Sequence, residues 1–174
     1  IRMGATVGDM DVFVRSMSAR GRLGGLSTAT SDAIHALDAF GKDVVLVETV
    51  GAGQNEVDVV RTAETVAVVV QPGSGDDVQM LKAGILEIGD VFVVNKADTD
   101  GAATTVSDLR EMLHLREGST TGAVGHRPES VVAGGDGDDD DDEAWDPRIV
   151  ETVATDGEGV DDLIGVLDDH YAHL

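Results

Sequence analysis

Short runs of valine and other apolar residues alternate along this chain with longer segments in which apolar residues recur at helical spacing. Runs that are apolar almost throughout are typical of parallel strands covered on both faces, and their alternation with helices is typical of βαβ units. We therefore predict an α/β fold with a mostly parallel sheet and helices on both faces. The expected strands are 44–47, 66–70, 91–94 and 149–153, with a weaker one at 11–17; the expected helices are 28–39, 57–63, 77–87, 106–115 and 160–173.

The charge of the chain disfavours several classes of partner. Its 34 Asp and Glu residues against 12 Lys and Arg residues give a formal net charge of −22. Nucleic acids and anionic membrane surfaces both bind clusters of Lys and Arg, so neither partner is expected. Because salt screens such self-repulsion, we predict a cytoplasmic protein of a halophilic organism; an acidic protein of a mesophile is the alternative.

Cysteine is absent from the chain, which excludes disulfides and cysteine-ligated metal sites. No apolar run approaches the roughly 18 residues that a membrane span needs, and no signal peptide opens the chain. Only His170 and His173 share a helical spacing that metal ligands could use, and we do not predict a metal site from that pair alone.

Residues 118–142 interrupt the α/β pattern with glycine-rich sequence that runs into six consecutive acidic residues at 138–143. The segment has no packing periodicity, so we interpret 118–142 as an acidic, disordered loop inserted into the domain. A Ca²⁺ or Mg²⁺ site is the alternative, but the spaced ligands and bidentate Glu of a calcium loop are missing.

The tetrapeptide Asn95-Lys96-Ala97-Asp98 directly follows the expected strand 91–94. It is therefore predicted at the carboxyl edge of a parallel sheet, where ligands bind in open α/β folds. An Asp carboxylate can accept hydrogen bonds from N1–H and the 2-amino group of guanine, a donor pair that adenine lacks. The Asn amide can hold the loop or contact the purine N7, and the Lys stem can lie on the base. We predict guanine recognition; a plain turn is the alternative.

Two further strand ends carry weaker signals. Glu48 follows the expected strand 44–47 and precedes Gly51, an order that suits a phosphate-sensing turn. Taken alone, an acid that closes an ordinary strand is the better explanation, but the position of this segment two strands before N-K-A-D favours phosphate sensing. The backbone N–H near Ala154, at the end of the last expected strand, could donate to the guanine O6.

Taken together, these motifs resemble the MeaB/ArgK family of P-loop GTPases, also labelled LAO/AO transport ATPases. The resemblance rests on R-S-M-x-x-R-G-x-L-G-G-L (15–26), E-T-V-G-x-G-Q-x-E-V-D (48–58), the segment 72–90, N-K-A-D (95–98) and T-V-A-T-x-G-E-G-V-D-D-L (152–163). It implies a SIMIBI-like G domain of the P-loop NTPase type, with residues 1–174 forming part of it.

The resemblance also implies a function. It implies a GTP-binding and GTP-hydrolysing switch that chaperones an adenosylcobalamin-dependent methylmalonyl-CoA mutase, through cofactor loading and protection. By matching position, Asn95, Lys96 and Asp98 would read guanine and Ala154 would touch it by its backbone. Glu48 and Gly51 would form switch II, completed by 54–58.

A third switch would match residues 73–82. It would let Lys82 approach the nucleotide in the activated complex; a solvated helix Lys is the alternative.

The chain departs from the family pattern in one important way, because it contains no G-x-x-x-x-G-K-[ST] motif. In the family that loop and the main Mg²⁺ ligands lie upstream of the position of Ile1. We therefore expect a fragment with its N-terminal part missing, and without useful GTP hydrolysis by itself. Homodimerisation is expected only of the full-length protein, since the family's dimerisation arm would follow Leu174.

Two other functions stay open on the sequence. One is an ATP-dependent kinase or ATPase associated with lysine, arginine and ornithine transport, which the guanine preference of Asp98 disfavours. The other is a nucleotide-free interaction domain.

Overall fold

The computed structural model describes residues 9, 11–17, 25–49, 62–73, 85–119 and 144–174 of the chain. The chain divides into two compact units, residues 1–62 and residues 63–174. Among the described residues, no helix is both long enough and apolar enough to cross a membrane.

The first unit contains helix α1 (Gly25–Ala39), which agrees with the helix predicted at 28–39. Its end is fixed by two backbone hydrogen bonds, from Gly41 N–H to the Asp38 carbonyl and from Lys42 N–H to the Leu37 carbonyl. The chain leaves the helix through Gly41, which has a φ of 77°. Glycine adopts this left-handed conformation without strain, and for that reason it is common just after the end of a helix.

The strands predicted at 44–47 and 11–17 are not found in the described part of the first unit. Val44 and Leu46 are 74% and 84% exposed instead of buried. A strand is stabilised by a ladder of hydrogen bonds to a neighbour, and the described residues offer these segments none. An apolar run alone was therefore not enough to predict a strand, and the predictions at 11–17 and 44–47 were wrong.

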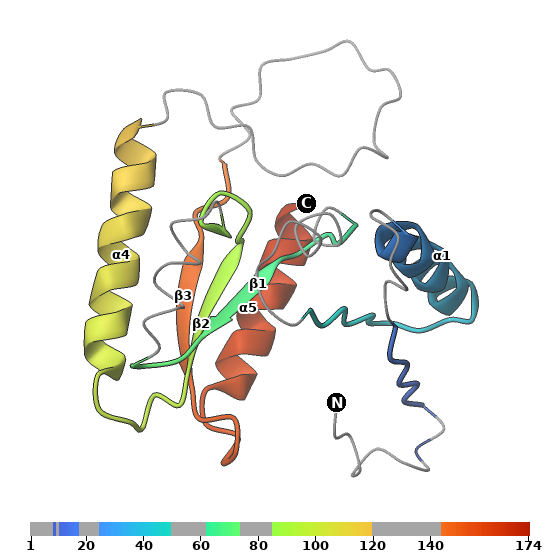
Figure 1. Cartoon of the computed structure of the whole chain (residues 1–174), viewed down its shortest axis with the longest axis horizontal. Helices are drawn as coiled ribbons and strands as arrows, with labels where there is room; N and C mark the ends of the chain where they lie inside the picture. The colour runs from blue at the N-terminus through green and yellow to red at the C-terminus, as the bar shows by residue number, and fades with distance from the viewer. Residues whose placement is uncertain (1–8, 10, 18–24, 50–61, 74–84, 120–143) are drawn as a thin grey trace. The chain divides into compact units, whose positions relative to one another are not determined.

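The second unit contains a parallel three-stranded sheet in the order β1-β2-β3. Its strands are β1 (Ala67–Val70), β2 (Val91–Asn95) and β3 (Arg148–Thr152), close to the predicted bounds. Helix α4 (Ala102–Ser119) follows β2, and helix α5 (Val160–His173) follows β3 (Figure 1). The predicted α/β fold with parallel strands is confirmed.

Helices cover both faces of this sheet, as the nearly continuous apolar strands require (Figure 1). On one face, α4 packs against the sheet through a cluster of buried residues, which are Val70, Phe92, Val94, Val106, Leu109 and Leu113. Along α4, the residues of this cluster are spaced three or four apart, so they lie on one side of the helix. The other face buries Val91, Val93 and Val150, with Leu163, Val166 and Leu167 of α5 packed against them.

The remaining predicted segments fall mainly outside the described residues. These are the helix at 57–63, most of the helix at 77–87, and the acidic insertion from residue 120 onward. Gly118 and Ser119, predicted as the start of that insertion, belong to the end of α4.

Candidate functional site

The carboxyl ends of the parallel strands lie at one edge of the sheet, which we call the carboxyl edge (Figure 1). Asn95 is the last residue of β2 and is in register with Thr152, the last residue of β3. The turn before α4 reaches the same edge, because a Cβ on Gly101 would lie 3.9 Å from Pro72, just after β1. Segments far apart in the sequence therefore meet where ligands bind in open α/β sheets.

Asn95 joins the loops that follow β2 and β3. Its Oδ1 accepts a hydrogen bond from the Ala154 N–H at 3.1 Å and another from the Thr152 hydroxyl at 3.3 Å. The Ala97 N–H donates to the Thr152 carbonyl at 3.1 Å. Thr152 is only 3% exposed, so these bonds are shielded on one side by the protein core.

Lys96 lies between these contacts with a φ of 60°, the left-handed conformation that a non-glycine residue rarely adopts. Its carbonyl accepts from the Thr99 N–H at 3.0 Å and from the Thr99 hydroxyl at 2.8 Å. These bonds hold the turn in its strained form, which costs on the order of 1 kcal/mol. The turn leaves the side chains of Lys96 and Asp98 exposed at the carboxyl edge.

The loop after β3 is closed by its own backbone. Val153 forms an antiparallel bridge with Glu158, its N–H donating to the Glu158 carbonyl at 3.0 Å. Gly157 and Gly159 have φ values of 79° and 72° within this loop. Because the loop is closed, Ala154 is held beside Asn95 without help from a ligand.

This edge offers a carboxylate, a fixed amide and a lysine stem around one exposed surface. Such a set can recognise a planar heterocycle that presents two adjacent donors and an acceptor. The Ala154 N–H, predicted to donate to guanine O6, donates to Asn95 in this structure, and its contact with guanine stays a prediction.

The structure brings together only part of the predicted site. Asn95, Lys96, Asp98 and Ala154 lie at the carboxyl edge of the second unit. Glu48 is described and exposed, but it belongs to the first unit. Gly51, Lys82 and residues 54–58 lie outside the described residues, as does the segment 73–82 except for Gly73.

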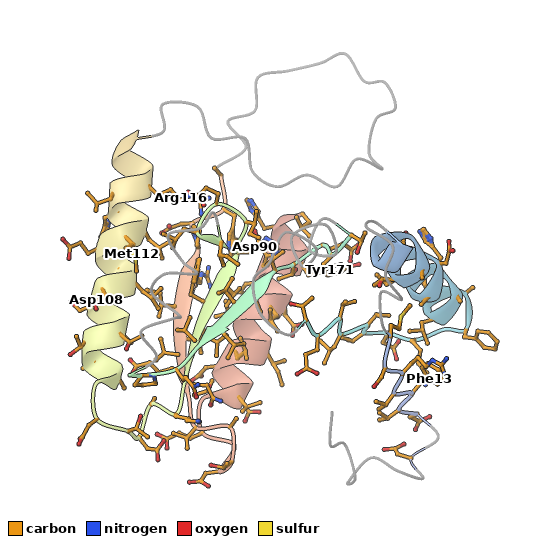
Figure 2. The ribbon with its side chains drawn as sticks, viewed as in Figure 1. Phe13, Asp90, Asp108, Met112, Arg116 and Tyr171 are labelled. Atoms are coloured by element: carbon orange, nitrogen blue, oxygen red, sulfur yellow. The ribbon has the colours of Figure 1, made fainter. Side chains whose placement is uncertain are left out.

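A second polar cluster lies at the opposite, amino-terminal edge of the sheet, and the sequence did not indicate it. Its centre is Asp90, just before β2, which Figure 2 shows near the same end of the unit as Arg116. One Asp90 carboxylate oxygen accepts from the Val66 N–H at 2.8 Å, and the Asp90 carbonyl accepts from the Trp145 indole N–H at 2.9 Å. Asp90 therefore ties the starts of β1, β2 and β3 together.

His170 of α5 completes this amino-edge cluster and is only 3% exposed. Its Nδ1 lies 2.8 Å from the Thr65 hydroxyl, its Nε2 lies 3.6 Å from an Asp90 carboxylate oxygen, and its ring meets Trp145 edge-on at 4.8 Å. Burial lowers the pKa of His170 below its ordinary value, an effect that Asp90 opposes and His173 reinforces.

Among the described residues, no group of three or more His, Cys, Asp or Glu side chains is arranged so that it could hold a metal ion. Two sequence features mark this amino-edge cluster: the polar residues just before two apolar runs, and the single tryptophan of the chain. A search for apolar strands does not consider either feature.

Known proteins are similar to this chain over its whole length. The family model described as "Methylmalonyl Co-A mutase-associated GTPase MeaB" matches residues 1–174. A protein of Pyrococcus horikoshii named as a GTPase is 48% identical over 174 residues, covering 100% of this chain and 49% of that protein. The GTPase ArgK of Escherichia coli is 32% identical over 155 residues, covering 87% of this chain and 40% of that protein.

A solved structure of a LAO/AO transport system kinase is similar to this chain with a TM-score of 0.57 and 24% sequence identity. The match covers 86% of this chain and 41% of that one, and at this identity it supports the fold alone. The chain spans about half the length of the curated relatives it matches, 49% of the Pyrococcus protein.

Proposed function

Because this chain belongs to the MeaB family of GTPases, we propose that the carboxyl edge of its second unit binds the guanine base of GTP and GDP. The observation that carries the proposal is the tie between the two loops at that edge: Asn95 accepts hydrogen bonds from Thr152 and Ala154. This tie holds the Asn95–Asp98 turn beside the loop after β3, so that one base can contact both. The whole protein would be a GTP-binding and GTP-hydrolysing switch.

Asp98 would select guanine over adenine. Its exposed carboxylate can accept from N1–H and from the 2-amino group of guanine at once, whereas adenine presents an acceptor at N1 and no 2-amino donor. The aliphatic stem of Lys96 would cover one face of the base. The Ala154 N–H would contact O6 only by sharing its hydrogen bond between Asn95 and the base.

The phosphate-sensing residues are proposed from the sequence and its resemblance to the family. Glu48 and Gly51 would sense the terminal phosphate as a switch, and Lys82 would approach the nucleotide in the activated complex. In the whole protein, Mg²⁺ would accompany the bound nucleotide. The ion would neutralise phosphate charge when bound. Among the described residues, no group of three or more His, Cys, Asp or Glu side chains could hold it.

The partner proposed for the whole protein is an adenosylcobalamin-dependent methylmalonyl-CoA mutase, whose cofactor loading and protection the switch would control. The family description, which names a mutase-associated GTPase, supports this partner. We also propose that the whole protein works in the cytoplasm and forms a homodimer.

The test is a titration of GDP, GTP, ATP and XDP into the whole protein in molar KCl, for the wild type and for Asp98→Asn. A hydrogen bond to a charged group contributes about 1.5–3 kcal/mol, so the substitution should weaken GDP binding at least tenfold. Asparagine presents a donor as well as an acceptor, which suits the 2-oxo group of xanthine, so XDP binding should strengthen. Asp100→Asn, which removes an exposed carboxylate two residues away, is the matched control and should change neither affinity.

Each other outcome would favour a different function. A preference for ATP that Asp98→Asn does not alter would support the transport-associated kinase or ATPase. Failure of the wild-type protein to bind any nucleotide would support the nucleotide-free interaction domain. Either result would refute the guanine site.

A further inference from the structure

Gly159, just before α5, makes an unusually close approach to the end of β3. It has a φ of 72° and a ψ of 0°. A Cβ placed on Gly159 would lie 2.1 Å from the Glu151 carbonyl oxygen and 3.2 Å from the Thr152 Cα. Since real Cβ atoms do not approach backbone atoms to 2.1 Å, any other residue at 159 would have to push the end of β3 away.

The end of β3 is the part of the molecule that holds Asn95. The Thr152 hydroxyl and the Ala154 N–H both donate to Asn95 Oδ1, and the Thr152 carbonyl accepts from Ala97 N–H. A displacement at Glu151 and Thr152 would therefore reach both the side chain of Asn95 and the backbone of the turn that follows it.

These contacts also fix which end of the Asn95 amide faces the loop. A backbone N–H can only donate, so the Asn95 atom at 3.1 Å from the Ala154 nitrogen must be the oxygen. The described hydrogen bonds to this side chain both end on Oδ1. The NH₂ group, at the other end of the planar amide, is then directed away from the loop as a donor.

We propose that Gly159 is a positioning residue for base recognition: through Thr152, it holds the Asn95 amide so that its NH₂ group, and not its oxygen, is presented to the nucleotide base. The proposal rests on the guanine site proposed above and deepens it. An NH₂ donor beside a guanine ring would meet an acceptor such as N7. The contribution of N7 to affinity should therefore depend on Gly159 and Thr152, although neither needs to touch the base.

The chain provides a matched control for the backbone conformation. Gly157 lies in the same loop with a φ of 79°, but a Cβ there would meet nothing within 4 Å. Gly157→Ala and Gly159→Ala therefore suffer similar conformational strain, and only Gly159→Ala collides with β3. Thr152→Val removes the hydroxyl with little change of shape, and Thr152→Ser restores it.

The experiment measures the dissociation constants of GDP and 7-deaza-GDP, which lacks the N7 acceptor, for the whole protein and these four variants. One neutral hydrogen bond contributes about 0.5–1.5 kcal/mol, so the wild type should bind GDP roughly three- to tenfold more tightly than 7-deaza-GDP. This ratio should fall to about one in Gly159→Ala. It should fall only part of the way in Thr152→Val, which keeps the bond from the Ala154 N–H to Asn95, and should persist in Gly157→Ala and Thr152→Ser.

The ratio separates positioning from general damage, because partial unfolding lowers the active fraction equally for both ligands. An unchanged ratio in Thr152→Val would overturn the proposal, and Thr152→Val carries this test if Gly159→Ala does not fold. A ratio of one in a wild type that still prefers guanine over adenine would also overturn it. A wild type that shows no preference for guanine over adenine nucleotides would instead refute the proposed function.

Discussion

Replacing Asp90 tests whether the amino-edge cluster stabilises the second unit. Asp90 Oδ2 accepts from the Val66 N–H at 2.8 Å, and Val66 is only 7% exposed. Asp90→Ala would leave this buried N–H without its acceptor, and an unsatisfied buried donor costs about 1–3 kcal/mol. The His170 ring would also lose the carboxylate 3.6 Å from its Nε2, a separation too long to count as a further hydrogen bond. We therefore expect the free energy of unfolding to fall by about 2 kcal/mol.

Asp90→Asn is the matched control. Its side-chain oxygen can still accept from Val66, and the Trp145 indole donates to the Asp90 backbone carbonyl, which both variants keep. The Asn variant should therefore lose less than about 1 kcal/mol.

Urea unfolding in molar KCl, followed by the fluorescence of Trp145, measures both variants. Trp145 is the chain's single tryptophan and belongs to the second unit, so its signal reports on the unit that contains Asp90. Both variants should unfold with the wild-type dependence on urea concentration, since the surface exposed on unfolding is unchanged. Equal losses for Asp90→Ala and Asp90→Asn would refute the reasoning, because they would show that the Val66 N–H does not depend on this acceptor.

Three further predictions concern the same unit and the whole chain. Because burial lowers the pKa of His170, the unfolded chain binds more protons below about pH 6.5, so stability should be complete above that pH and fall as pH drops toward the lowered pKa. A pH series of urea unfolding in which His170→Gln shows the same slope as the wild type would contradict this. Leu109→Ala, at a fully buried position, should cost about 2–5 kcal/mol by calorimetry or urea unfolding, against less than about 0.5 kcal/mol for Leu115→Ala at a position 65% exposed on the same helix. With a net charge of −22, the chain should melt several degrees higher in molar KCl than at about 0.1 M, and an unchanged melting temperature would refute the halophilic interpretation.

In the described part of this chain, apolar runs form strands only where a neighbouring strand pairs with them. The strands at 66–70, 91–94 and 149–153 were each found within one residue of the predicted bounds at either end. The equally apolar run at 44–47 was not a strand in the described residues, with Leu46 84% exposed. The difference is a partner: each confirmed strand pairs with a neighbour, and pairing is a property of the whole sheet that a local run cannot reveal.

Part of the candidate site was also predicted from the sequence, and part was not. The sequence placed Asn95 and Asp98 at a strand end, and the structure agrees, because a strand's end follows from where its apolar run stops. It did not indicate that the Ala154 N–H is engaged by Asn95, or that Lys96 is left-handed. The hydrogen bond from Thr152 to Asn95 and the close approach of Gly159 to β3 could not be predicted from the sequence either.

By itself, then, the sequence determined the class of fold, the helices α1, α4 and α5, the covered sheet, and the turn that carries the candidate base-reading residues. These depend on local periodicity and on residue types that lie next to one another in the chain. Only the tertiary structure decided the orientation of the Asn95 amide, the burial of His170 and the close approach of Gly159 to β3. Asn95 and Ala154 are 59 residues apart, and Thr65 and His170 are 105 apart. Contacts over such separations exist only after the strands have paired and the helices have packed, because pairing and packing together set which donor meets which acceptor.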